Sequence, residues 1–130
     1  MQGRVEWTSG TGMVGINASG QRIEMDWETG PSPMQLTLQM VGACSLVDVV
    51  IGLKDRAFTK AWVDLDSTRA EASPRRFVTM TMVYHVVGDV PQKLVERIVE
   101  KSHEKYCSVS KSLDPSIAID WRVELHDSDA

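Results

Sequence analysis

The stretch SPMQLTLQMVGACSLVDVVIGL, residues 32–53, decides the fold of this chain of 130 residues. It opens with Ser32, Pro33 and Gln35, which match the N-cap, the first helical position and the third position of a capping box. The positions that follow are apolar on nearly every side of a helix, which is typical of a central helix. Gln35 and Asp48 interrupt the stretch and no aromatic or basic anchors flank it, so we expect a buried soluble helix and no membrane span.

The composition indicates one small soluble domain. A length of 130 residues leaves room for a single core, so we expect one domain over residues 1–130. The 14 basic and 18 acidic residues give a formal charge of −4, which argues against a nucleic-acid partner. Two cysteines are too few for a disulfide scaffold, and residues 1–10 lack the pattern of a signal peptide, so we expect a cytoplasmic protein.

The remaining segments predict short strands around two helices. A second, amphipathic helix is expected from Asp89 to about Tyr106, followed by a break or a new short helical turn. Alternating apolar residues predict strands at residues 4–7, 14–16, 21–26, 61–66, 77–87 and 117–125. Because the strands come in runs and not one per helix, we predict an α+β fold with antiparallel sheets, a long buried central helix and a second helix.

Cys44 and Cys107 are the first candidates for a chemical role. Cys44 lies in the middle of the apolar helix, and Cys107 lies at the seam between two helical segments, where free backbone N–H groups favour an anion. On a continuous helix His103 and Glu104 would share a face with Cys107, so the histidine could accept the thiol proton and the carboxylate could orient the histidine. The simpler interpretation is that the cysteines are packing residues and that His103 and Glu104 belong to a solvated face.

A metal site and an apolar pocket are two further interpretations of the sequence. Zinc would need both cysteines and two of the three histidines, and no local spacing of these residues supports it, so we expect no metal. The seven methionines indicate a soft interior, either as core filling or as the lining of an apolar ligand pocket.

Two segments together resemble the OsmC/Ohr family of osmotically inducible and organic-hydroperoxide-resistance proteins. They are SPMQL at 32–36 followed by VGACS at 41–45, and YCSVSKSL at 106–113. The resemblance covers nearly the whole chain and is strongest to the YhfA-like branch of OsmC-like proteins. It implies an OsmC-like fold and an intertwined homodimer with its sites near the subunit interface.

The resemblance also implies a peroxidase that uses no metal, haem or other cofactor. In the family the first cysteine, here Cys44, attacks the peroxide O–O bond and becomes a sulfenic acid, which the second, here Cys107, resolves to a disulfide. A dithiol reductant then restores the pair. The expected function is therefore a thiol-dependent hydroperoxide reductase or related redox protein of the oxidative-stress response, with a small hydroperoxide as substrate.

The sequence departs from the family's peroxidases at the residues that hold the thiolate. Ohr-type peroxidases carry Pro-Glu ten residues before the first cysteine and an arginine in the Gly-rich N-terminal segment, and the corresponding residues here are Met34 and Met13. A cysteine without a nearby cation ionises little at neutral pH. Met13 and Met34 are instead expected to line the substrate pocket. The alternative is a catalytically weak redox-sensing or apolar-ligand-binding module that keeps the fold and the cysteine pair.

Overall fold

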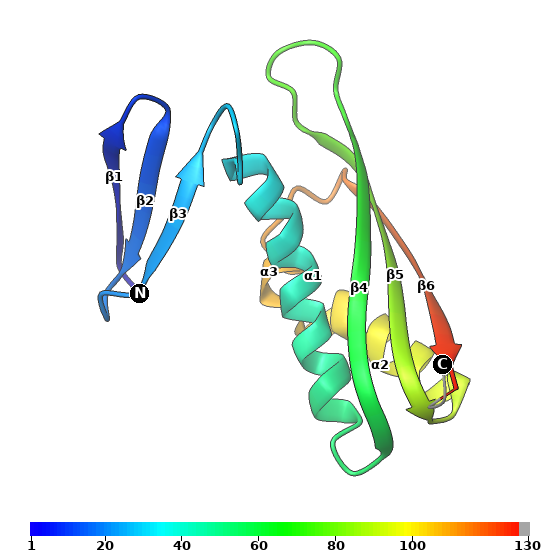
Figure 1. The fold of residues 1–130 in the computed structure, drawn as a ribbon. Coiled ribbons are helices and arrows are strands. Elements are labelled where there is room, and N and C mark those ends of the chain that lie inside the picture. The colour runs from blue at the N-terminus through cyan, green and yellow to red at the C-terminus, as the bar shows by residue number, and fades with distance from the viewer. Residues whose placement is uncertain (128–130) are drawn as a thin grey trace. The chain divides into compact units, whose positions relative to one another are not determined.

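A computed structural model describes residues 1–127 of the chain (Figure 1). Three strands, a long helix, two strands, a run of helical segments and a last strand follow one another as predicted, which confirms the α+β class. Contacts divide the chain into two compact units, Met1–Thr37 and the part from Leu38 onward. The expectation of a single domain over residues 1–130 stays a prediction.

The first unit contains a three-stranded antiparallel sheet. Its strands are β1 (Gly3–Ser9), β2 (Gly12–Asn17) and β3 (Arg22–Asp26), hydrogen-bonded in that order. All three lie where the alternating pattern predicts strands. The β2–β3 turn is closed by the side-chain oxygen of Asn17, which accepts the backbone N–H of Gln21 at 2.9 Å.

The long helix α1 runs over Pro33–Gly52 and begins with the predicted capping box. The backbone N–H of Gln35 donates to the Ser32 hydroxyl at 3.2 Å, and the backbone N–H of Ser32 donates to the Gln35 side-chain oxygen at 2.9 Å. The two bonds satisfy N–H groups that a helix start leaves without partners.

One face of α1 is buried within this chain and the opposite face is exposed, whereas the apolar sequence predicts burial nearly all round. The buried residues are Val41, Gly42, Ser45 and Val49. Val47 and Ile51 on the opposite face expose 53% and 61% of their surface. By length and mean hydropathy, 1.6, α1 could cross a membrane, but the core helix of a soluble protein passes the same test.

The second unit contains a mixed sheet of β4 (Ala57–Arg69), β5 (Phe77–Asp89) and β6 (Ala118–His126), in that order. The β4–β5 pair is antiparallel, as predicted, but β5 and β6 run parallel. The prediction of purely antiparallel sheets was therefore wrong for this pair. Helical segments join β5 to β6, and such a crossover returns the chain to the same end of the sheet, which a parallel pairing requires.

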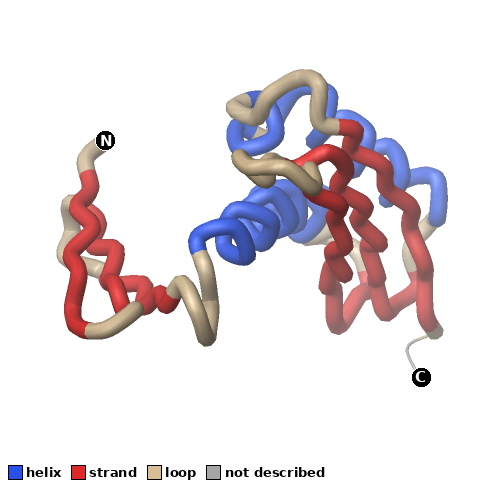
Figure 2. Tube along the Cα trace, turned by 90° about the horizontal axis from the view of Figure 1, so that it is seen from above, coloured by secondary structure: helices blue, strands red, loops and turns tan. Residues whose placement is uncertain are grey.

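The connection between β5 and β6 consists of α2 (Gln92–Lys101), a π-helical turn η1 (Ser102–Tyr106) and α3 (Ser108–Lys111). The predicted break after the second helix is therefore confirmed at Cys107. Figure 2 shows the three strands of the second sheet side by side, next to the helical segments. The fully buried core side chains are mainly those of α1, β5 and α2, among them Val49, Met80, Met82, Tyr84, Val86, Val95 and Val99.

Gly88 lies opposite Phe58, next to an irregularity in the β4–β5 pairing. Its φ is 151°, and a Cβ there would overlap the carbonyl oxygen of Ala57 and lie 2.5 Å from the Cα of Phe58. Both neighbours are backbone atoms that cannot rotate away, so only glycine fits this position.

We expect Gly88→Ala to lower the free energy of unfolding by about 2–4 kcal/mol, because overpacking adds to backbone strain. Gly20→Ala is the matched control, since Gly20 also has a positive φ, 83°, but faces open space. That control should cost only about 1–2 kcal/mol. Urea denaturation measures both, and equal losses would show that the overlap at Gly88 does not matter.

Candidate functional site

Cys44 and Cys107 are free thiols on separate elements that the fold brings together. Cys44 is half-buried on α1, and Cys107 is fully buried between η1 and α3. Burial is the largest cause that raises the pKa of Cys107, and the nearby side chain of Cys44 raises it further. The two residues are far apart in the sequence, and the second unit makes them neighbours.

The π-helical turn η1 decides how the chain reaches Cys107. The backbone N–H of Cys107 donates to the carbonyl of Ser102 at 2.6 Å, which spans five residues where an α-helix spans four. Cys107 then has extended dihedral angles, φ −74° and ψ 103°, and caps α3. Its Sγ accepts the backbone N–H of Ser110 at 3.4 Å.

Burial is the main influence on the Cys107 thiol and raises its pKa above the usual value. The side chain and backbone N–H of Ser110 oppose this shift by hydrogen bonding to the sulfur, and Cys44 adds to it. None of these groups is a cation. The thiol of Cys107 is therefore protonated at neutral pH, which is the opposite of the activation that the helix seam predicts.

Tyr84 connects the sheet to both helical elements of the site. Its ring is fully buried, and its hydroxyl shares hydrogen bonds with Ser45 Oγ of α1, at 2.5 Å, and with His103 Nε2 of η1, at 2.7 Å. Burial raises the pKa of Tyr84 well above its usual range. The hydroxyl therefore keeps its proton and serves as a neutral hydrogen-bonding group.

His103 continues this network toward the second cysteine. Its Nδ1 shares a hydrogen bond with the Ser110 hydroxyl at 3.1 Å, and Ser110 in turn contacts Cys107. Burial lowers the pKa of His103, while the negative charge of Asp48 acts in the other direction. His103 is therefore neutral at pH 7 and able to accept a proton.

The charge that acts on this network is negative. Asp48 lies one turn after Cys44 on α1, and its Oδ2 accepts the hydroxyl of Ser102 at 2.6 Å. Its carboxylate raises the pKa of both Tyr84 and His103. An anion thus acts on the site for which the resemblance implies a cation.

The other predicted site residues lie as follows. Glu104 is exposed and forms no ion pair within residues 1–127, so in this structure it does not orient His103. Met13 lies on β2, opposite Met25, and Met34 lies in the first turn of α1. Both belong to the first unit, and their part in a substrate pocket stays a prediction.

Sequence reasoning missed Tyr84, Ser45 and Asp48. A tyrosine on the apolar face of a predicted strand signals a buried hydroxyl that needs a partner, so Tyr84 could have been found. A lone carboxylate in an apolar helix, one turn from a cysteine, is a similar signal for Asp48. The partners themselves depend on tertiary packing and leave no trace in the sequence.

The fold and the two cysteine segments match a known protein family. The family model described as OsmC-like protein matches residues 26–122. The chain therefore belongs to the OsmC-like family, which confirms the resemblance of its two cysteine segments.

Particular relatives give the comparison more detail. Protein YhfA of Escherichia coli (strain K12) is 38% identical over 131 residues, which cover 96% of this chain and 98% of that protein. The crystal structure of a hypothetical protein from Aquifex aeolicus is 32% identical with a TM-score of 0.83, covering 96% of each chain. An organic hydroperoxide resistance protein from Elizabethkingia anophelis, 14% identical with a TM-score of 0.72 over 97% of each chain, shares the fold.

The titration of His103 makes the stability of the protein depend on pH. A histidine in the unfolded chain has a pKa of about 6.5, and burial lowers the pKa of His103 in the folded chain. Between the two values the unfolded chain binds more protons. The contribution of neutral His103 is therefore complete above about pH 6.5 and is lost as the pH falls through the folded pKa.

We expect the stability advantage of the wild type over His103→Gln to shrink between about pH 8 and pH 5. Urea denaturation of both proteins at several pH values measures this difference. Glutamine keeps a polar side chain of similar reach but does not titrate. An advantage that grows at low pH would show that the folded protein holds His103 as a cation.

Proposed function

We propose that the chain is a thiol-dependent hydroperoxide reductase with Cys44 and Cys107 as its redox pair. The observation that carries the proposal is that these two free thiols, far apart in the sequence, lie close enough for Cys44 to raise the pKa of Cys107 beyond the effect of burial. A peroxide cycle that ends in a disulfide needs two sulfurs that can meet. Two cysteines that served only as packing residues would have no need to lie together. Solved relatives described as organic hydroperoxide resistance proteins support the same reading.

The difference in exposure supports different roles for the two cysteines in the proposed cycle. Cys44 is half-buried and reachable by a substrate, whereas Cys107 is fully buried. The thiolate of Cys44 attacks one peroxide oxygen, the O–O bond breaks, and the alkoxide takes a proton and leaves as an alcohol. Cys44 is oxidised to a sulfenic acid and the hydroperoxide is reduced by two electrons.

The second step forms the disulfide. The sulfur of Cys107 attacks the sulfur of Cys44, and the hydroxyl of the sulfenic acid leaves as water with a proton. A dithiol reductant then supplies two electrons and two protons, which restores both thiols and converts the reductant to its disulfide.

The hydrogen-bonded network offers a route for the proton of Cys107. Ser110 contacts the sulfur, and its hydroxyl shares a hydrogen bond with Nδ1 of His103. Neutral His103 accepts the proton, and Tyr84 holds the ring from its other nitrogen. In this proposal His103 acts as a base at the second step and promotes thiolate formation, which a cation promotes in the family's peroxidases. Because burial raises the pKa of Cys107, the second step speeds up as the pH rises.

The exposed face of α1 fits the expected homodimer. Ala43, Leu46, Val47, Val50 and Ile51 line an apolar groove on this helix. A second copy of the chain would remove this surface from water and place its own α1 next to Cys44. We include the homodimer and a cytoplasmic location, where dithiol reductants keep cysteines reduced, in the proposed function.

We expect the wild type to reduce cumene hydroperoxide in the presence of dithiothreitol, and Cys44→Ser to fall to the rate without protein. Without dithiothreitol, Cys107→Ser should consume one equivalent of peroxide and stop as a sulfenic acid that dimedone traps. Ala72→Ser, in the exposed loop between β4 and β5, is the control that adds a serine, keeps both thiols and leaves the proposed dimer face unchanged. Oxidation of Cys44 without turnover would favour the redox sensor, and no oxidation would contradict both functions.

We expect His103→Gln to slow disulfide formation by about a hundredfold and to leave the rate of sulfenic acid formation unchanged. Stopped-flow measurement of the two phases after one addition of peroxide separates them. Tyr84→Phe is the partner variant, since it removes the hydrogen bond that holds Nε2 and keeps the ring. Equal slowing of both phases would assign His103 a structural role only.

A further inference from the structure

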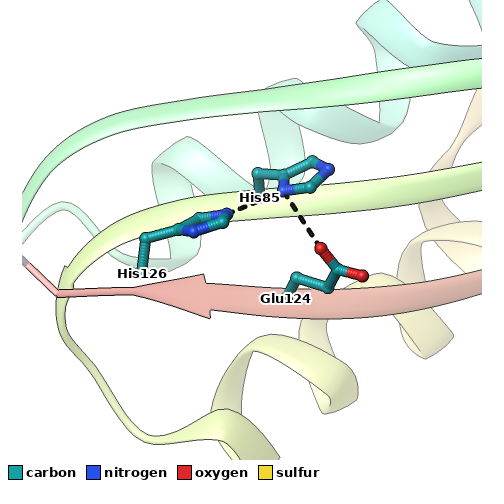
Figure 3. Close-up of side chains that lie close together, drawn as sticks. All are labelled: His85, Glu124 and His126. Carbon is teal, nitrogen blue, oxygen red and sulfur yellow. Dashed lines mark hydrogen bonds and ion pairs between the residues drawn. The ribbon is translucent and has the colours of Figure 1, made fainter. Parts of the chain in front are cut away.

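The outer face of the second sheet carries a second cluster of chemically active side chains. His85, Glu124 and His126 point toward one another there (Figure 3). One possible ligand atom from each residue lies within 4.8 Å of the other two. His85 is on β5 and faces away from Tyr84, so the proposed thiol chemistry does not use this cluster.

The register of the sheet assembles the cluster. His85 is paired with Glu124, and Val87 is paired with His126, across the parallel β5–β6 ladder. Positions 124 and 126 share one face of β6 because side chains alternate along a strand. The sequence places His126 in what looks like a polar tail, and only the parallel pairing brings it beside His85.

We propose that His85, His126 and Glu124 bind a divalent late first-row transition metal ion such as Ni²⁺. Two imidazoles and a carboxylate form a donor set that binds such ions in preference to Mg²⁺ or Ca²⁺, which favour oxygen ligands alone. His85 Nδ1 lies 2.8 Å from His126 Nε2 and 3.6 Å from Glu124 Oε2. Two nitrogens held by one ion at about 2.0–2.1 Å are about 2.9 Å apart when the bonds are perpendicular, as in octahedral or tetragonal coordination.

Asp64 selects the nitrogen of His85 that faces the ion. Its Oδ2 lies 3.1 Å from Nε2 of His85, and a neutral imidazole with its proton on Nε2 donates to this carboxylate. Nδ1 then carries the lone pair and faces His126 and Glu124. A carboxylate behind a metal-binding histidine is a common device that fixes the tautomer and increases the basicity of the ligand.

Trp62 holds both rings in place. Its ring stacks on His85 at 4.6 Å between centroids and 5° between planes, and on His126 at 5.4 Å and 12°. The two imidazoles thus lose little further side-chain freedom when an ion binds. To admit the ion, His126 at the end of β6 gives up its hydrogen bond to His85. Its ring proton then lies on Nδ1, which leaves the lone pair of Nε2 free for the ion.

Water reaches the cluster through its carboxylates. The side chain of His85 is 11% exposed, whereas those of Glu124 and Asp64 are 42% and 69% exposed. Arg122 pairs with Oε1 of Glu124 at 2.9 Å and leaves Oε2 directed at His85. Lys60 lies over the ring of Trp62, at 5.1 Å from its centroid. The two cations balance the two carboxylates before an ion binds, and the remaining coordination positions are left to water.

The experiment uses full-length Cys44→Ser/Cys107→Ser protein, because the thiols are competing ligands. Ni²⁺ is added during calorimetric titration and during NMR, where its unpaired electrons broaden signals of nearby residues. We expect one Ni²⁺ per chain, broadening around Glu124 and His126, and affinity about tenfold or more weaker in His126→Gln and Glu124→Gln. Asp64→Asn should weaken binding by about tenfold without removing a ligand.

Asp120→Asn is the matched control, since Asp120 lies on the same strand and the same face as Glu124 but outside the cluster. It should bind Ni²⁺ as the parent does, and Mg²⁺ should bind none of the proteins measurably. Absence of Ni²⁺ binding would overturn the proposal. So would equal affinity in the parent and His126→Gln, or broadening confined to His103, which would place the ion on the other face of the sheet. Hydroperoxide reduction by the native protein is measured separately, so failure of the proposed peroxidase activity would not affect the Ni²⁺ binding result.

Discussion

A hydrogen bond between the hydroxyls of Ser45 and Tyr84 joins the buried face of α1 to the buried face of β5. Both groups are fully buried, and a buried hydroxyl without a partner costs about 1–3 kcal/mol, so helix and sheet must meet at this point. Gly42 permits the approach, because a Cβ there would lie 3.0–3.1 Å from side-chain carbons of Leu65 and Val63. Cys44 lies between Gly42 and Ser45 on α1, so the contacts of these two residues with the sheet fix its position.

The burial that joins helix and sheet also sets the charge of the site. It raises the pKa of Tyr84 and of Cys107 and lowers that of His103, so each of the three groups is neutral near pH 7. The carboxylate of Asp48 raises the pKa of Tyr84 and of His103. A site of this kind stabilises intermediates through hydrogen bonds and proton transfer more than through a fixed cation.

Local patterns in the sequence predicted most of the fold. Ser32 and Gln35 marked the start of α1, and alternation located the strands, although β4 extends several residues beyond the predicted 61–66. The direction of β6 was not predictable, because it depends on the path through three helical segments. At the site, both cysteines and His103 were visible as residue types. The π-helical turn that directs His103 to Tyr84 depends on packing between elements, and no short-range pattern encodes it.

Adjacent residues of β5 serve the two faces of the sheet, with Tyr84 directed to the helices and His85 to the outer cluster. A shift of the strand by one residue would exchange them and destroy both arrangements, so the register of β5 must be fixed firmly. The pairing irregularity beside Phe58 and Gly88 provides this constraint at one end, where a side chain at Gly88 would overlap backbone. At the other end, the parallel ladder pairs His85 with Glu124. The same register therefore places a neutral hydrogen-bonding tyrosine beside the thiols and a metal-binding histidine beside its carboxylates.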